Sequence, residues 1–186
     1  MDNNLEKIKA GFCAGFNFNH EDWKNGKKEL DFSTKKNCFN NTIGKVVRLL
    51  LSNSDCDKDV YLNKVNRSIK NKNIQSKPFI LLYAEALYMM YKENSRVDIW
   101  DALFASPYTE YKTVYKHLLD SYYVCPEYNK EDEDFVNDEC YIMQIALYHF
   151  WHDTPFVSAI NTGAVNHKDF NLTAAIGALC SRYLPL

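Results

Sequence analysis

The residues best suited to chemistry by type and spacing lie in a short run late in the chain. His167 and Asp169 stand two positions apart, and a histidine near a carboxylate can exchange protons as a general acid and base. Asn166 and His167 also precede a predicted helix, where their side chains could instead cap it or fix the loop by local hydrogen bonds. An Asp/His adjacency alone does not define a catalytic site, so we assign no catalytic residue.

Other catalytic and metal-binding patterns do not occur in the sequence. The chain has no Ser-His-Asp order, no Gly-rich phosphate loop and no cysteine in a nucleophile context. Its six cysteines are scattered, without a C-x-x-C pair or a histidine spacing that would build a zinc site. We therefore interpret the cysteines as reduced thiols.

Charge and hydropathy limit the class of partner. Lys plus Arg number 22 and Asp plus Glu 24, and the formal net charge of -2 favours a small ligand or a protein over nucleic acid or a membrane surface. No stretch reaches the roughly 18 apolar residues of a membrane span, and the first residues have no apolar leader pattern, so we expect a cytoplasmic protein. Gly and Pro are few while Asn, Lys and Tyr are abundant, a bias typical of an AT-rich genome that favours a phage, virus or parasite source.

The elements that must position these residues are predicted to be helices. Hydrophobic periodicity predicts helices over residues 5–16, 40–52, 55–65, 78–93, 97–104, 110–123, 136–151, 153–165 and 172–183. Segment 78–93 begins at Pro78 and is apolar on nearly all sides, which is typical of a central helix. The polar segment 17–37 is predicted to be a long loop bordering a site. Because no alternating strand pattern or repeat occurs, we predict a compact all-α bundle forming a single domain over residues 1–186.

The chain carries AVNH at residues 164–167, TAAIGAL at residues 173–179 and the opening segment LEKIKAGFCAGF, and through these segments it resembles the ADP-ribosylglycohydrolase family, in its dinitrogenase reductase-activating glycohydrolase-like form. Residues 164–167 and 173–179 are similar to the segments that flank the acidic metal-binding loop of that family. Residues 5–16 and 33–51 are similar to its opening glycine-containing helix and to its T-D-D-T segment with the helix that follows. The resemblance covers roughly residues 5–52 and 77–184 and implies the helical fold of that family.

The chain departs from the family where the family binds metal. There, aspartates of the two segments hold a pair of magnesium ions that orient the ribose and activate water. Here Asp169 is the acidic residue left in the later segment, and the earlier one has lysine, asparagine and phenylalanine in place of the aspartates. A hard divalent cation needs several oxygen ligands, usually including carboxylates. We therefore predict no metal, no cofactor and no metal-dependent hydrolysis.

The resemblance then implies a ligand-binding cleft without the family's chemistry. Lysines in place of carboxylates attract a pyrophosphate directly, and Phe39 and Phe170 are candidates to stack on adenine. Each also has a structural alternative, because exposed lysines are usually just solvated and aromatic rings usually anchor a core or a loop. The candidate ligand-binding residues are Lys35, Lys36, Phe39, Asn40, Asn166, His167, Lys168, Asp169, Phe170 and Asn171.

Three functions remain open at this stage. The first is a pseudoenzyme that sequesters an ADP-ribose-like or cyclic nucleotide, such as an NAD-derived immune signal, as an anti-defence protein of a phage or virus in the host cytoplasm. The second is a protein-interaction module that inhibits a host enzyme through a Tyr-rich surface. The third is a diverged, metal-independent hydrolase centred on Asp169 and His167. A homo-oligomer is compatible with all three.

Overall fold

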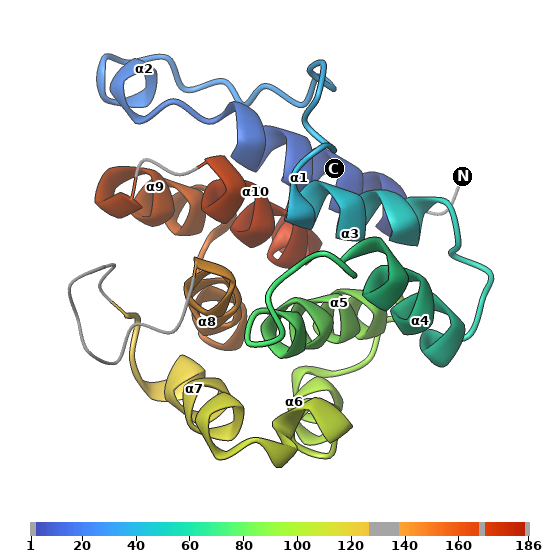
Figure 1. Ribbon diagram of the computed structural model, residues 1–186. Helices are drawn as coiled ribbons and strands as arrows, with labels where there is room; N and C mark the ends of the chain where they lie inside the picture. The colour runs from blue at the N-terminus through green and yellow to red at the C-terminus, as the bar shows by residue number, and fades with distance from the viewer. Residues whose placement is uncertain (1–2, 127–137, 168–169, 185–186) are drawn as a thin grey trace.

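The computed structural model describes residues 3–126, 138–167 and 170–184, and helices are the regular secondary structure of these residues (Figure 1). The predicted all-α class is therefore confirmed for the described residues, which pack as one compact bundle. The elements are α1 (Asn3–Asn17), α2 (His20–Lys24), α3 (Thr42–Leu51), α4 (Lys58–Ser68), α5 (Lys77–Tyr91), α6 (Arg96–Phe104), α7 (Lys112–Tyr123), α8 (Asp138–Trp151), α9 (Phe156–His167) and α10 (Phe170–Leu179), with the 3-10 helices η1 (Pro107–Glu110) and η2 (Ser181–Tyr183).

Helix α5 lies at the centre of the bundle, as its apolar sequence predicts. Nearly all of its side chains are buried, and α4, α6, α8 and α10 pack around it. Pro78 stands in its first turn, where the missing N–H would have had no helical partner. The Tyr83 hydroxyl donates to the carbonyl oxygen of Ala175 at 2.9 Å, which ties α5 to α10. Burial raises the pKa of Tyr83 well above its ordinary value, so the phenol remains a neutral donor.

Helices α1 and α10 lie side by side, although they are far apart in the sequence (Figure 1). A Cβ atom added at Gly11 would lie closer than 3.0 Å to the carbonyl oxygen of Gly177, and one added at Gly15 would lie equally close to that of Thr173. Because the later residue of α1 meets the earlier residue of α10, the two helices run antiparallel. The contact brings the end of α1 next to the start of α10.

Aromatic side chains join α6, α7 and α8 in a second layer. Trp100 of α6 meets both Tyr122 of α7 and Trp151 of α8 edge to face, each with ring centres 5.2 Å apart. The Trp151 indole N–H donates to the Ser121 hydroxyl at 3.2 Å, and the Arg96 guanidinium donates to the Trp151 carbonyl oxygen at 2.7 Å. The indole N–H and the carbonyl oxygen of Trp151 therefore both have partners, and these contacts join the three helices.

The largest difference from the sequence prediction is in segment 17–37. This segment is not a continuous loop, because the short helix α2 forms inside it. Asn19 caps α2 by accepting hydrogen bonds from the N–H groups of Glu21 and Asp22. His20 is hydrogen-bonded through Nδ1 to Oδ1 of Asn161 in α9, 2.9 Å away. A contact so distant in sequence cannot be recognised from local periodicity.

Helix boundaries elsewhere follow local capping. The sequence predicts Asn40 or Asn41 as the cap of α3, and Asn41 caps it by accepting from the Gly44 N–H at 2.6 Å. Helix α9 begins at Phe156, after Pro155, and α10 begins at Phe170, so the predicted boundaries at residues 153 and 172 are off by a few residues. Among the described residues, no helix combines the length and the apolar character needed to cross a bilayer.

Candidate functional site

The end of α1 carries two phenylalanine rings that contact both segments of the resemblance. Phe39 stacks on Phe12, with ring centres 5.0 Å apart and ring planes 11° apart. Phe170, at the start of α10, packs on Phe16 with ring centres 6.1 Å apart. Phe12 and Phe16 are themselves stacked, one turn apart on α1. Phe39 and Phe170 are therefore joined through a row of aromatic rings that crosses α1.

The exposed areas of the two rings differ. Phe170 is 60% exposed, so most of its ring is open to solvent. Phe39 is partly buried and packs against the core. A Cβ added at Gly44 would lie closer than 3.0 Å to the Phe39 backbone, so glycine allows the start of α3 to sit directly against the turn that carries this ring. Phe39 is thus held as an anchor, whereas Phe170 presents an open ring.

Asn17, the last residue of α1, fixes the segment that follows α2. Its Nδ2 donates to the carbonyl oxygens of Asp31 at 2.9 Å and Ser33 at 2.8 Å. Its Oδ1 is buried and has no hydrogen-bond partner in the described part of the chain. Nearby, Cys13 Sγ lies 3.8 Å from Thr34 Oγ1, a further contact between α1 and this segment. The segment is therefore attached to α1 mainly through one side-chain amide.

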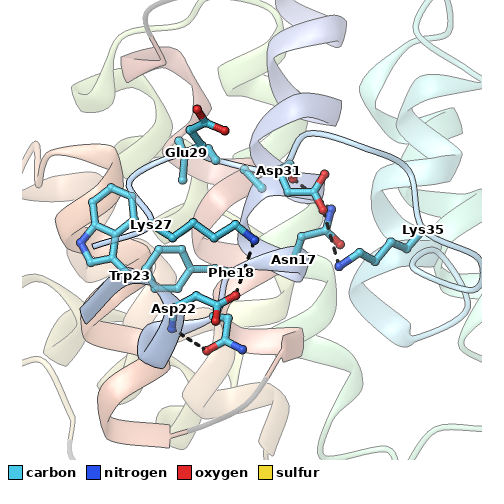
Figure 2. Close-up of a pocket in the computed structure, with 11 residues that line it drawn as sticks. Asn17, Phe18, Asp22, Trp23, Lys27, Glu29, Asp31 and Lys35 are labelled. Carbon is cyan, nitrogen blue, oxygen red and sulfur yellow. Dashed lines mark hydrogen bonds and ion pairs between the residues drawn. The ribbon is translucent and has the colours of Figure 1, made fainter. Parts of the chain in front are cut away.

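A small hollow opens where this segment folds over α1 and α2 (Figure 2). Its volume is about 160 Å³. Its lining residues are Ala14, Asn17, Phe18, Asn19, Asp22, Trp23, Lys27, Glu29, Leu30, Asp31 and Lys35. Phe18 and Trp23 contribute aromatic surface, with ring centres 5.7 Å apart. The hollow thus combines aromatic rings with both signs of charge.

The charges around the hollow are paired. Figure 2 shows Lys27 reaching Asp22 and Lys35 reaching Asp31, and both nitrogen–oxygen distances are 3.6 Å. Hydrogen bonds from the Ser33 hydroxyl and N–H lower the pKa of Asp31 below its usual range, so this carboxylate is ionised near neutral pH. All four charged side chains are largely exposed, so their pairing is weak and an incoming anion can exchange with it.

The structure brings together some of the sequence-predicted residues. Lys35 lines the hollow, while Lys36 is exposed beside it and has no ion-pair partner among the described residues. Asn40 donates from Nδ2 to Oδ1 of Asn37 at 2.9 Å and stabilises a turn in which Asn37 has a positive φ of 73°. Asn171 is partly buried in the first turn of α10.

The remaining predicted residues lie at the α9–α10 junction. Asn166 and His167 are in the last turn of α9, and their side chains lie outside the described part of the structure. Lys168 and Asp169 lie outside the described residues altogether. The structure therefore places the α10 side of this junction beside α1 but gives no geometry for its predicted acid/base pair.

Sequence reasoning missed most of the residues that form the hollow. Asn17 and Trp23 had no motif around them, and only the unusual length of the polar segment 17–37 pointed to this region.

Within the residues that the structure describes, no group of three or more His, Cys, Asp or Glu side chains could hold a metal ion.

Comparison with known proteins gives no relative for this chain: no family model, no curated protein and no solved structure matches it significantly.

Proposed function

We propose that this protein binds an ADP-ribose-type nucleotide at the end of α1 and does not hydrolyse it. The observation that carries the proposal is the aromatic row from Phe39 through α1 to Phe170. Phe39 and Phe170 come from segments that are far apart in the sequence and resemble the ADP-ribosylglycohydrolase family, and they contact Phe12 and Phe16, which lie on successive turns of α1. A shared ligand site would explain why both segments lie against α1.

The hollow suits one aromatic ring of such a ligand. A cavity of about 150 Å³ is large enough for benzene, so a volume of about 160 Å³ admits a single base rather than a whole dinucleotide. The partly buried Trp23 offers ring surface for stacking, and the buried Phe18 packs against its ring. The unpartnered Oδ1 of Asn17 can accept a hydrogen bond from an exocyclic amine such as that of adenine.

The pyrophosphate of the ligand would lie outside the hollow, against the exposed lysines. Lys35 is held only by its exposed pair with Asp31, which contributes at most about 1 kcal/mol. A pyrophosphate carries more charge than one carboxylate and can replace Asp31 as the partner of Lys35. Lys36 is exposed next to it and needs no rearrangement to take part.

We expect the bound nucleotide not to be hydrolysed, because the sequence has lysine, asparagine and phenylalanine where the family has most of its metal-binding aspartates. Sequestration of a nucleotide signal needs only affinity. In a phage or virus, a protein of this kind would act against a host defence that signals through an NAD-derived nucleotide.

A ligand screen tests the proposal directly. The purified chain is heated with ADP-ribose, cyclic ADP-ribose, NAD, AMP or a cyclic dinucleotide, with and without magnesium, and the nucleotide is recovered and analysed by chromatography. Binding to the native state must raise the melting temperature. We expect a magnesium-independent rise with an ADP-ribose-type ligand that is recovered intact. A rise that requires magnesium, or recovery of cleaved ligand, would instead identify a hydrolase, and no rise with any nucleotide would exclude this function.

Variants then locate the binding site. Lys35→Ala combined with Lys36→Ala should weaken binding about tenfold, because two charge-assisted contacts are lost. The matched control is Lys70→Ala combined with Lys112→Ala, which removes the same charge from two exposed positions that do not line the hollow. Equal affinity of the two double variants would place the ligand elsewhere.

A second candidate function is a protein-interaction module, and an apolar groove next to α7 favours it. The groove has a volume of about 630 Å³ and is lined mainly by apolar side chains, among them Ile74, Pro78, Tyr111 and Val114. Ile74 is 78% exposed and Tyr111 is 66% exposed, which is unusual for large side chains without a covering partner.

Affinity capture from a host lysate tests this second function. The function requires a captured protein whose binding is lost when the groove is altered. A partner that binds the wild type but is lost with Ile74→Asp and Tyr111→Ser would support it. Val97→Ser is the control, because Val97 is 68% exposed but does not line the groove. A partner retained by the groove variants would argue against the groove as its binding surface.

A further inference from the structure

A second cleft, remote from the end of α1, lies between α4, α5 and the connection from α6 to η1. Its volume is about 400 Å³. Polar side chains in its lining include Lys58 and Asp59 of α4, Glu85 of α5, and Ser106 and Tyr108 beside η1. Nothing in the nucleotide-binding proposal uses these residues.

Glu85 places a charged group in the most buried helix of the protein. The residue is 3% exposed, and Oε1 accepts from Lys58 Nζ at 2.6 Å. Replacing a buried ion pair by apolar residues is often neutral or stabilising, so the pair is not explained by a gain in stability. Lys58 itself is partly exposed, so its ammonium can leave for solvent if another cation takes its place on Glu85.

Ser106 provides an independent sign of a ligand at this cleft. The residue is 5% exposed and stands at the N-cap of η1, yet its hydroxyl makes no capping hydrogen bond. Oγ has no hydrogen-bond partner of any kind in the described part of the chain. Leaving a buried hydroxyl unpaired costs about 1–3 kcal/mol. A ligand that pairs with Oγ would recover this cost.

The charge of the cleft selects the kind of ligand. The lining carries two carboxylates, Asp59 and Glu85, and one ammonium, Lys58, so the lining residues sum to one negative charge. Burial raises the pKa of Tyr108, and the nearby charges of Glu85 and Asp59 raise it further, so the phenol ring stays neutral in a negative surrounding. A neutral tyrosine face attracts cations.

The walls add an apolar requirement. Leu62, Ala102, Ala105 and Pro107 also line the cleft. These side chains can cover a short aliphatic chain but offer no side-chain hydrogen bond. We propose that this cleft binds a small protonated alkylamine, whose ammonium lies between Glu85, Asp59 and the Tyr108 ring and donates to Ser106 Oγ. The amine shares Glu85 with Lys58 or displaces Lys58 from it.

Calorimetric titration with 1,4-diaminobutane and with n-butylamine tests this proposal, and succinate serves as an anionic probe of similar length. We expect both amines to bind and succinate not to bind. Ser106→Ala should leave the folded protein at least as stable as the wild type, because the deleted hydroxyl has no partner, and should weaken amine binding on the order of fivefold to tenfold. Glu85→Gln should weaken it by at least about tenfold.

Ser181→Ala is the matched control. Ser181 Oγ is likewise buried without a partner, but Ser181 does not line the cleft, so this variant should bind the amines within about twofold of the wild type. The proposal is wrong if neither amine binds at millimolar concentration, if succinate binds instead, or if Ser106→Ala binds the amines as tightly as Ser181→Ala. If Glu85→Gln fails to fold, the comparison of the two serine variants still decides the outcome.

Discussion

Gly177 of α10 rests against Gly11 of α1 with no side chain between the two backbones. A methyl group at position 177 would overlap the carbonyl of Gly11, and the two helices would have to move apart. Alanine stabilises a helix by about 1 kcal/mol relative to glycine. If alanine at position 177 nevertheless makes the protein less stable, the loss comes from this overlap.

We expect Gly177→Ala to lower the free energy of unfolding by about 2 kcal/mol or more despite that gain, measured by urea denaturation. Gly163→Ala is the control, since its added methyl would come too close only to the flexible end of Ile176, at 2.8 Å, and would make ordinary contacts with Thr173 and Leu172. Gly163→Ala should lower the free energy of unfolding distinctly less than Gly177→Ala does. A Gly177→Ala protein as stable as the wild type would show that α1 and α10 do not approach so closely.

His149 should make the protein less stable as the solution becomes acidic. Burial, with a smaller effect from the charge of His152, lowers the pKa of His149 to about 4. The unfolded chain therefore binds this proton at a higher pH than the folded chain does, and the free energy of unfolding falls as the pH drops from about 6.5 toward 4. The loss between pH 7.5 and pH 5 should be about 2 kcal/mol.

Denaturation at both pH values, in the wild type and in His149→Gln, isolates this group. The variant removes the titrating ring, so its stability should change less with pH. In His152→Gln the buried His149 is retained, so most of the loss of stability at low pH should remain. Identical pH dependence in the wild type and His149→Gln would mean that His149 titrates normally.

Asn17 should control how firmly the segment after α2 is held. Asn17→Ala removes the hydrogen bonds to the carbonyl oxygens of Asp31 and Ser33 and should let this segment open without unfolding the bundle. Tryptic cleavage after Lys27, Lys28 or Lys35 should then become about fivefold faster, as followed by mass spectrometry. Asn19→Ala, which removes the cap of α2, separates the two effects. If Asn19→Ala accelerates cleavage as much as Asn17→Ala, the amide of Asn17 does not hold the segment.

The cysteines should react with a thiol reagent in an order set by burial. All six are free, and burial raises the pKa of Cys140 and Cys180 to about 12 each. Both should therefore resist Ellman's reagent at pH 8 in the folded protein, whereas the partly exposed Cys56 should react early. Full reactivity in denaturant provides the reference. Rapid labelling of Cys180 in the native protein would contradict its burial beneath α1.

The features predicted well from sequence are those that depend on neighbours along the chain. Pro78 and an apolar run predict α5, and Asn41 before a periodic segment predicts the cap of α3. The helix α2 was missed because five residues give too short a pattern, and part of its support comes from Asn161, far along the sequence.

The candidate site was predictable only in part, for the same reason. The predicted phenylalanines, Phe39 and Phe170, pack against one helix, α1, but the hollow at the end of that helix depends on a side-chain amide that reaches two carbonyl groups more than ten residues away. No periodicity records which backbone carbonyls an asparagine will meet. The negative cleft at Glu85 was likewise hidden, since a single glutamate in an apolar helix has the same sequence pattern whether it pairs with a lysine or binds a ligand.

The pairing of α1 with α10 also limits how far the bundle can fold while the chain is being synthesised. The apolar face of α1 is synthesised early, yet the helix that covers it is made last among the described helices. Until α10 emerges, that face is open to chaperones or to other nascent chains, and the bundle cannot close from its N-terminal side. Packing of α1 in the described bundle is therefore completed only after α10 has been synthesised, when the later sequence docks onto the earlier sequence.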